Sequence, residues 1–413
     1  DDVWSVDNVA VFDHLSGKCQ LLVTTRDVNV VRGSRGVVYE LDIMKPDESR
    51  TLFYRCAGIK PGELSSFSPR MHEIIEELLK ECKGLPLALS LVSSNLNGTR
   101  SEQDWEDILD GFTTDLEEIR SMFPTDDYPY DNMIKAINVS FEHLEKCEQE
   151  KFLDFAIFPE DTSIPSDILE LFWSSEGVGR TSCIPRKARR ILDALERKSM
   201  IQKELESKEK TSYRVHDLLL DFARKKVKAT GKLTDVQRLF LETLRCQCVN
   251  GEWNISSTSN QKDYYFKYLP YHIYSSEQQS ELLQLFFDLH WLQQKVKQTN
   301  IPSVVSDFRF LDPLSEEMKL LKSSLMLSSY VIEKNPNSIC PQLLGRLLSY
   351  EKEYPRVKML IQQLQESGTK TCHLLPLPSC LDLGGPEISR KIFDLPVWSV
   401  ATRKSSTGTV VIC

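Results

Sequence analysis

Four short motifs stand in one order along this chain, and they constrain its fold and function more than its composition does. They are Asp1-Asp2-Val3-Trp4, Leu22-Val23-Thr24-Thr25-Arg26-Asp27, Cys82-Lys83-Gly84-Leu85-Pro86-Leu87-Ala88-Leu89 and Val215-His216-Asp217-Leu218-Leu219. Any one of them alone would be weak evidence, because short motifs recur by chance. Their shared order along one chain is what carries information.

The composition is that of an ordinary globular protein. The 413 residues are enough for about two to four domains. Hydrophobic residues make up 41% of the chain, and no run reaches the ~18 apolar residues of a membrane span. The net charge of -9 disfavours a nucleic-acid or anionic-membrane surface. Eleven cysteines without a Cys-x-x-Cys pair, and no visible signal peptide, predict a cytoplasmic protein.

Two segments near the N-terminus have the pattern of sheet strands. Residues 20–24 include the apolar run Leu21-Leu22-Val23, which is typical of a strand buried on both faces of a parallel sheet. Residues 37–44 predict a second short strand, and residues 45–48 then predict a helix start. Together they indicate a remnant of a parallel α/β P-loop-type sheet in a chain that is otherwise mainly α and multidomain.

From Ser68 the periodicity becomes helical. Ser68 suits the N-cap of a helix, Pro69 its first turn and Gly84 its left-handed end. A break rich in Pro, Asp and Tyr follows at residues 123–129. One face of the predicted helix collects the side chains of Met71, Ile74, Ile75, Leu78, Leu79 and Cys82.

Three helices and a hairpin are predicted in the middle of the chain. The helices are residues 133–144, 166–173 and 186–200, and the hairpin pairs residues 201–206 with 212–215. This succession is the winged-helix pattern. The buried face of the third helix consists of Ala188, Ile191, Leu192 and Leu195.

Residues from about 234 to 349 predict further helices. Pro- and Gly-containing segments within residues 375–386 predict a linker, and residues 397–401 and 409–412 predict a last hairpin around a turn at 404–408. Two sets of apolar residues each share one helical face: Leu282, Leu285, Phe286, Leu289 and Val296, and then Leu321, Leu325 and Ile332.

Two of the motifs supply charged side chains at strand ends, where parallel sheets bind their ligands. If an apolar strand precedes them, Asp1 and Asp2 can hold a magnesium ion beside the phosphates of a nucleotide. Otherwise they are only an acidic N-terminus. Arg26 follows the strand at 20–24, and its planar guanidinium suits bidentate contacts to a terminal phosphate. The alternative for Arg26 is a surface arginine at a strand end.

The other two motifs stand at helix ends. Gly84 supplies a left-handed cap and Pro86 can start the next helix, which is a sufficient structural role. The functional addition is packing of the proline ring on a nucleobase. His216 precedes a helix predicted over residues 218–226 and could donate to a phosphate oxygen there. Asp217 could cap that helix, and a capping pair without a ligand is the alternative.

Basic runs at residues 186–190 and 224–226 raise a different function. A winged helix with a basic third helix is a DNA-binding architecture. More often such runs are a solvated face, and the net charge of -9 supports that interpretation. The sequence contains no Gly-x-x-x-x-Gly-Lys-Ser/Thr, no His-Glu-x-x-His and no Gly-x-Ser-x-Gly. It therefore predicts no self-contained catalytic site.

Together the motifs resemble the NB-ARC family of STAND-class signal-transduction ATPases, which includes plant disease-resistance proteins and the apoptotic protease-activating factor. Residues 152–161 are similar to that family's characteristic segment inside the winged helix, and the resemblance covers residues 1–226. Residues 265–272 and 287–292 look like the helical segment of members that carry a WD-repeat propeller. Residues 342–347 are similar to what precedes such propellers.

The resemblance implies a role for each motif. Asp1 and Asp2 would take the Walker B role, with Asp1 as a magnesium ligand. Arg26 would sense the phosphate and Pro86 would contact the adenine, with Gly84 beside it among the cofactor-binding residues. The implied cofactors are ADP or ATP with magnesium.

The resemblance also implies how such a protein switches. His216 would contact the β-phosphate of bound ADP and hold a closed state, and exchange for ATP would release the winged helix and permit a homo-oligomer to form. The implied partners are nucleotide and signalling proteins of defence or programmed cell death. Neither a membrane nor a nucleic acid is an expected partner.

The sequence departs from the family pattern at the phosphate-binding loop. Without that loop there is no lysine for the β- and γ-phosphates and no nest of backbone amides. We therefore expect this chain alone to bind nucleotide weakly or not at all and to be no enzyme by itself, whereas the family's complete members act as slow ATPase switches. Two alternatives remain, namely a nucleotide-free interaction scaffold and a winged-helix DNA-binding protein.

The motifs and breaks predict a division into five parts. Residues 1–66 form the C-terminal part of a nucleotide-binding α/β domain, and residues 67–128 a helical domain. Residues 129–233 form the winged-helix domain and residues 234–350 a second helical domain. Residues 351–413 form a linker and the start of a WD-repeat propeller.

Overall fold

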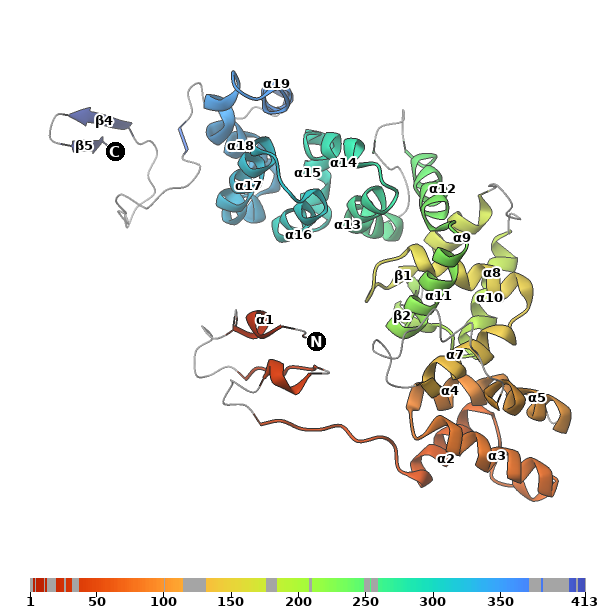
Figure 1. The fold of residues 1–413 in the computed structure, drawn as a ribbon. Helices are drawn as coiled ribbons and strands as arrows, with labels where there is room; N and C mark the ends of the chain where they lie inside the picture. Colours follow the sequence, from red (N-terminus) through yellow and green to blue (C-terminus); the bar gives the residue numbers. More distant parts are fainter. Residues whose placement is uncertain are drawn as a thin grey trace. The chain divides into compact units, whose positions relative to one another are not determined.

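The computed structural model divides the chain into two compact units, Asp1–Glu145 (unit 1) and Lys146–Cys413 (unit 2). The helices and strands of both units are drawn in Figure 1. The structure describes residues 3, 5–10, 12, 20–25, 27–31, 37–99, 101–113, 131–175, 184–207, 210–248, 253, 259–370, 380–381, 401–405 and 408–412. The predicted break at 123–129 and the predicted linker segments at 375–378 and 384–386 lie outside these residues.

The elements that pack against one another in the described part of unit 1 are mainly helices. Helix α2 packs against α4, α3 against α5, and α4 against α7. Its α-helices are α1 (Val6–Ala10), α2 (Pro46–Cys56), α3 (Pro69–Cys82), α4 (Pro86–Asn95), α5 (Glu102–Thr113) and α7 (Asp131–Glu142), with 3-10 turns at η1 (Val28–Val30) and η2 (Leu64–Ser66).

Helix α3 confirms the prediction made from its caps and period. Ser68 is the N-cap, and its Oγ accepts a hydrogen bond from the Met71 N–H at 3.1 Å. The helix ends where Lys83 and Gly84 take left-handed backbone angles, with φ of 48° and 70°. The predicted face is buried at Met71, Ile74, Ile75, Leu78 and Cys82, and Leu79 is half-buried at its border.

The two strands predicted before α2 do not form in this structure. Residues 20–25 and 37–45 are extended but belong to no sheet. Leu22 exposes 90% of its surface, where the prediction for residues 20–24 required burial, and Val37 and Leu41 in the second predicted strand expose 98% and 89%. A strand exists only when a neighbour pairs its N–H and C=O groups. Among the described residues, the Val3 N–H donates to the Thr24 carbonyl and the Met44 N–H to the Gly84 carbonyl, but neither segment is paired as a strand. The predictions of a buried strand at 20–24 and of a second strand at 37–44 were therefore wrong for this structure.

Unit 2 begins with a winged helix. A three-stranded antiparallel sheet of order β1-β3-β2 lies beside its helices, and Tyr213 on β3 pairs with Ile164 on one side and Lys203 on the other. Its elements are α8 (Lys146–Leu153), η3 (Asp154–Ile157), β1 (Ile164–Pro165), α9 (Ser166–Ser174), α10 (Pro185–Arg197), β2 (Gln202–Ser207), β3 (Lys210–Arg214) and α11 (Asp217–Ala229).

The winged-helix prediction is confirmed for the hairpin and for two of its three helices, whereas the first predicted helix, 133–144, forms as α7 in unit 1. Helices α9 and α10 and the hairpin of β2 and β3 all form within a few residues of the expected bounds. The strand β1 and the helix α8 were not foreseen. A two-residue strand such as β1 carries no periodicity from which it could be recognised. The third helix buries all four predicted residues, Ala188, Ile191, Leu192 and Leu195.

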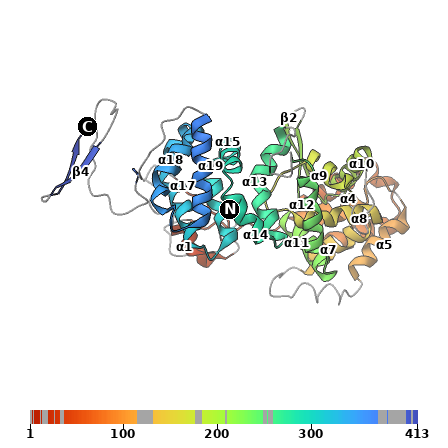
Figure 2. The same cartoon turned by 90° about the horizontal axis from the view of Figure 1, so that it is seen from above.

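The remaining helices of unit 2 follow one another closely. Helices α17, α18 and α19 all pack against one another (Figures 1 and 2). The elements are α12 (Leu233–Arg245), α13 (Ser259–Ser275), α14 (Gln279–Phe286), α15 (Leu289–Gln298), α16 (Ile301–Asp307), η5 (Phe308–Leu311), α17 (Glu316–Lys334), η6 (Pro336–Ser338), α18 (Ile339–Leu347), η7 (Leu348–Tyr350) and α19 (Pro355–Lys370).

The apolar face predicted from Leu282 to Val296 is buried but lies on two helices. The helix is interrupted between α14 and α15. Asp288 is the N-cap of α15, and its Oδ1 accepts a hydrogen bond from the Trp291 N–H at 3.1 Å. The prediction that these five residues share the face of one helix was therefore wrong, although all five are buried in the core. The predicted face of Leu321, Leu325 and Ile332 is fully buried on α17.

The last hairpin forms with its first strand displaced. Strand β4 (Ala401–Ser405) pairs antiparallel with β5 (Gly408–Ile412), so the first strand begins where the predicted one ended. The second strand forms nearly as expected, and the turn is shorter than the predicted 404–408. Among the described residues, no helix combines the length and apolar character needed to cross a bilayer.

Candidate functional site

The first two motifs lie side by side in unit 1. The Val3 N–H donates to the carbonyl of Thr24 at 2.9 Å, and the Thr25 hydroxyl donates to the carbonyl of Val3 at 2.7 Å. Asp1, Asp2 and Arg26 lie outside the described residues. Their predicted roles as magnesium ligands and phosphate sensor therefore stay predictions, although the backbone beside them is brought together.

The turn between α3 and α4 holds Gly84 and Pro86 in a fixed geometry. The Met44 N–H donates to the Gly84 carbonyl at 3.0 Å. A Cβ at residue 84 would lie 2.6 Å from the Met44 carbonyl oxygen, so both the contact and the φ of +70° require glycine. Pro86 is the first residue of α4 and is exposed. The predicted helix stop and start are confirmed, and the exposed ring suits packing on a flat base.

His216 is the N-cap of α11. Its Nδ1 accepts a hydrogen bond from the Leu218 N–H at 3.2 Å, and the residue is exposed. A neutral imidazole whose Nδ1 accepts carries its proton on Nε2, which makes Nε2 a donor. The prediction of a helix start at this motif is correct. The cap, however, is His216 and not Asp217, which lies in the first turn.

Arg224 ties α11 to the segment that precedes β1. Its guanidinium donates to the carbonyls of Ala156 and Phe158 at 3.3 and 2.8 Å and to Glu160 at 2.5 Å. Hydrogen bonds from a charged group are stronger than neutral ones. The helix that carries His216 is therefore fixed to residues 156–160. From the sequence, Arg224 was recognised only as part of the basic run at 224–226. Nothing in that run indicates contacts with residues 156–160.

The basic run at 186–190 is also partly neutralised within the chain. Arg189 on α10 makes a forked contact to Glu170 on α9, with Nε 2.6 Å and Nη2 3.3 Å from the two carboxylate oxygens. Arg224 is likewise engaged by Glu160. Two of the cations that suggested a DNA-binding face therefore hold the winged helix together.

A buried aromatic cluster joins the winged helix to α12 and α13. The ring of Phe158 lies 5.4 Å from Phe240, 6.1 Å from Tyr264 and 6.0 Å from His272 between ring centroids. His272 is fully buried, its Nε2 lies 2.8 Å from the Tyr264 hydroxyl, and its Nδ1 lies 2.7 Å from Gln237 Nε2. Burial lowers the pKa of His272 from its ordinary value of 6.5 to about 3, so the ring is neutral at physiological pH.

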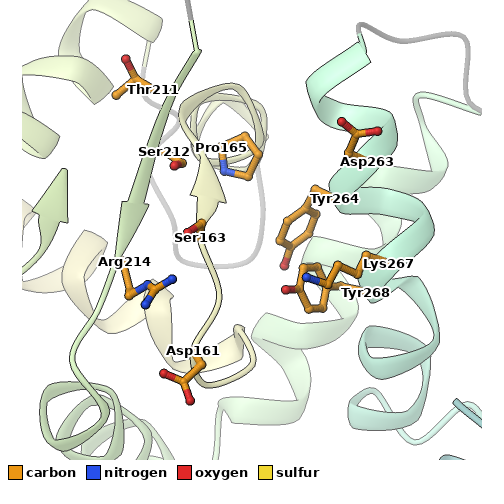
Figure 3. A pocket seen from close by; sticks show the side chains of 10 residues that line it. All are labelled: Asp161, Ser163, Pro165, Thr211, Ser212, Arg214, Asp263, Tyr264, Lys267 and Tyr268. Atoms are coloured by element: carbon orange, nitrogen blue, oxygen red, sulfur yellow. The ribbon is translucent and has the colours of Figure 1, made fainter. Parts of the chain in front are cut away.

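A polar cleft of about 320 Å³ opens beside this cluster, between the winged-helix sheet and α13 (Figure 3). One wall comes from β1 and β3 and the other from α13. Asp161, Lys267 and Tyr268 lie in segments that resemble the family, but no motif predicted a cleft, because tertiary packing brings its residues together from three separate segments. The cleft is lined by Asp161, Ser163, Pro165, Thr211, Ser212, Arg214, Asp263, Tyr264, Lys267 and Tyr268.

The predicted nucleotide residues are divided between the two units. Gly84 and Pro86 share one turn in unit 1, and His216 lies in unit 2. Each is presented in a way that fits the chemistry of a nucleotide, namely an exposed proline ring and an imidazole donor at a helix start.

The fold defines a class of protein: a winged helix that continues directly into an all-helical domain. Residues 157–223 match the winged-helix domain of disease resistance proteins, and residues 233–340 match the APAF-1 helical domain. Each of these matches falls on the elements described above for unit 2.

Matches to curated proteins extend this likeness. The chain is 22% identical to apoptotic protease-activating factor 1 of Danio rerio over 382 residues, which is 90% of this chain and 28% of that protein. It is 24% identical to the Homo sapiens protein of the same name over 311 residues, or 75% of this chain and 23% of that protein. A probable disease resistance protein of Arabidopsis thaliana is 29% identical over 176 residues, 42% of this chain and 20% of that protein.

These likenesses make the chain a relative of the NB-ARC-type STAND ATPases. The predicted resemblance is thereby confirmed. The chain spans roughly a quarter of the length of the curated relatives it matches, so the activity of the whole proteins does not transfer to it directly.

Proposed function

We propose that this chain is part of a nucleotide-controlled signalling switch in programmed cell death or defence, with His216 as the residue that reads the β-phosphate of ADP. The observation that carries the proposal is the N-cap geometry of His216. Its Nδ1 is engaged by the Leu218 N–H, which directs the proton to Nε2 and makes that atom the donor for a phosphate oxygen.

Three further observations support the same proposal. Arg224 fixes α11, so a contact at His216 acts on the whole winged helix. Gly84 and Pro86 form a rigid turn with an exposed ring. The relatives include apoptotic protease-activating factors and disease resistance proteins. Nucleotide binding, magnesium at Asp1, phosphate sensing by Arg26 and homo-oligomerisation on activation all belong to this proposal.

The proposal includes a reducing, cytoplasmic location. The seven cysteines of the described residues are all free thiols, as expected where glutathione keeps thiols reduced.

The decisive experiment compares ADP retention with and without the histidine. In residues 1–413 alone we expect weak or no ADP binding by calorimetry, because the sequence has no phosphate-binding loop. In a chain extended upstream to include such a loop, His216→Ala should speed ADP release. His290→Ala, at an exposed histidine on α15, is the matched control and should change nothing. Equal release rates in both variants would contradict the role of His216.

A nucleotide-free scaffold is the second candidate, favoured by the outer face of α17. Met326, Leu327, Tyr330 and Val331 expose 54%, 48%, 68% and 40% of their surface on that helix, and exposed apolar patches often mark protein contacts. Under this candidate, Tyr330→Ser should abolish signalling in cells while His216→Ala leaves it intact. The opposite pattern would favour the nucleotide switch.

A DNA-binding function has less support. Arg189 and Arg224 are held by Glu170 and Glu160, and the net charge is -9. We expect no salt-dependent binding to duplex DNA in a titration of potassium chloride, since such binding requires cations that are available to phosphates.

A further inference from the structure

The polar cleft between the winged-helix sheet and α13 combines two cations with a buried hydroxyl that has no partner. Figure 3 shows Arg214 from β3 and Lys267 from α13 pointing toward each other across the cleft, with Asp161 and Asp263 at its opposite ends. Lys267 lies 5.1 Å from the Tyr268 ring centroid and forms no ion pair among the described residues. Two like charges that converge on one space leave a position suited to an anion.

Ser212 adds a donor that the protein itself does not use. Its side chain is 4% exposed, lines the cleft, and its Oγ has no hydrogen-bond partner in the described part of the chain. Burying a hydroxyl without a partner is costly, and such groups in native proteins call for an explanation. A ligand oxygen in the cleft would satisfy it.

Glu204 on β2 organises the same wall without entering the cleft. Its carboxylate accepts from the Ser163 hydroxyl, and its Oε1 lies 3.2 Å from Arg214 Nε. The pairing of Glu204 with Ser212 across β2 and β3 places these groups on one part of the sheet. Glu204 thus offsets part of the charge of Arg214 and holds its guanidinium beside the cleft.

We propose that this cleft binds a small phosphate-bearing molecule. A phosphate group carries close to two negative charges and three acceptor oxygens, which matches two cations and the Ser212 hydroxyl. A carboxylate has one charge and two oxygens, and Arg214 already has a carboxylate partner in Glu204. The volume of about 320 Å³ is at the lower end of small-molecule sites, and the Tyr264 and Tyr268 rings offer an apolar wall for the organic part.

Occupation of the cleft would have a structural consequence. One wall belongs to the segment that matches the winged-helix domain and the other to the segment that matches the APAF-1 helical domain. A bound phosphate therefore stabilises the packing of one on the other. The site shares no residue with the nucleotide switch proposed at His216, so either proposal can fail without the other.

The first test is calorimetric titration of the full chain with inorganic phosphate and, separately, with glycerol 3-phosphate, at constant ionic strength set by potassium chloride. Lys267→Met should weaken phosphate binding by about tenfold or more, the loss expected for a charged hydrogen bond. Lys262→Met, one and a half turns earlier on α13 and outside the cleft lining, is the matched control and should bind as the unaltered chain does.

The second variant separates binding from stability. Ser212→Ala removes the buried unpartnered hydroxyl without adding any atom to the site. The ligand-free protein should then unfold at a higher temperature, whereas the further rise caused by phosphate should shrink. A merely structural serine would give the first effect without the second, and that result would contradict the proposal.

The two ligands distinguish the source of the phosphate. Tighter binding of glycerol 3-phosphate would assign the site to a phosphomonoester that uses the aromatic wall, and equal or tighter binding of inorganic phosphate would assign it to the free anion. Absence of binding by both, or unchanged binding in Lys267→Met with an unchanged circular dichroism spectrum, would overturn the proposal.

Discussion

Two regions of this molecule contain large apolar side chains, which are buried in one region and exposed in the other. In unit 2, Phe158, Phe240 and Tyr264 are at most 3% exposed and pack ring against ring. In unit 1, Leu22 and Val37 expose 90% and 98% of their surface on extended segments that pair with no strand among the described residues. Apolar character alone therefore does not decide burial in this chain.

The difference lies in where the partners are in the sequence. The partners of Phe158 are supplied by α12 and α13, roughly a hundred residues downstream and within the same unit. Extended segments such as 37–45 need adjacent strands to pair their backbone groups. A helix pairs its own backbone, so the helical regions fold on local information and need only a packing surface.

The largest effect is expected at the centre of the aromatic cluster. Phe158→Ala removes a ring that contacts Phe155, Phe240, Tyr264 and His272. Truncation of a buried phenylalanine costs about 3–5 kcal/mol, because the transfer free energy is lost and a cavity remains. The unfolding free energy should be measured by urea denaturation, with hydrogen exchange to assign the loss to α12 and α13.

The matched control for this prediction is Phe12→Ala in unit 1. Phe12 is 49% exposed, so its truncation should change stability by less than about 0.5 kcal/mol. Similar costs at the two phenylalanines would contradict the contrast between the regions.

The second effect is a loss of stability in acid that comes from His272. Its pKa is about 3 in the folded chain and 6.5 in the exposed side chain. The unfolded chain therefore binds a proton that the folded chain excludes as pH falls below 6.5. This stability is complete above pH 6.5 and declines by roughly 1.4 kcal/mol per pH unit between pH 6.5 and 3.

The measurement is the unfolding free energy of unit 2 against pH in the unaltered chain and in His272→Gln. Carboxylates contribute to both curves, so the difference between them isolates the histidine. His290→Ala, at an exposed histidine, should leave the curve unchanged. Parallel curves for the unaltered chain and His272→Gln would mean that the ring is not excluded from protonation.

The third effect tests the turn that carries Pro86. Gly84→Ala combines a left-handed φ of +70° with a Cβ 2.6 Å from the Met44 carbonyl oxygen. The backbone strain alone costs about 1–2 kcal/mol, and displacement of Met44 adds to it. Gly231→Ala has the same φ of +70° but meets no atom within 4 Å. Urea denaturation should show a larger loss of unfolding free energy in Gly84→Ala than in Gly231→Ala, and the difference is the cost of the clash with Met44. Equal losses of unfolding free energy in the two variants would show that the clash costs nothing.

The parts of the fold that could be predicted are those whose causes are local. Helix α3 was correctly bounded because Ser68, Pro69 and Gly84 are caps that act within a few residues. The break between α14 and α15 was missed because an apolar face continues across it. Asp288, which caps α15, was the available signal. The strands predicted at 20–24 and 37–44 do not form in the structure, because a strand requires pairing neighbours that a local pattern cannot supply.

The candidate site divides in the same way. The position of His216 at a helix start was predictable from the motif. That His216 and not Asp217 is the cap depends on side-chain geometry, which the motif does not give. The contacts of Arg224 with residues 156–160 and the cleft of Ser212, Arg214 and Lys267 were not predictable. Both join segments that lie tens of residues apart.

The smallest expected effect is at Leu41. It gives the sharpest test of the contrast between exposed and buried apolar residues, because Leu41 and a buried leucine can be compared within unit 1. Leu41 is 89% exposed on the extended segment, whereas Leu78 is fully buried on α3. Leu41→Ser should change the unfolding free energy of unit 1 by less than about 0.5 kcal/mol. Leu78→Ser should cost several times more, at least the roughly 2–5 kcal/mol of truncating a buried leucine.

Both variants make the same chemical change, so only the surroundings of the side chain differ. If Leu41→Ser proved as costly as Leu78→Ser, the segment at 37–45 would have to be paired in solution, for instance with the same segment of a second copy. Sedimentation would then reveal an oligomer that Leu41→Ser dissociates. A small effect together with a monomer would show that this alternating apolar pattern contributes nothing to stability until a neighbouring strand is present.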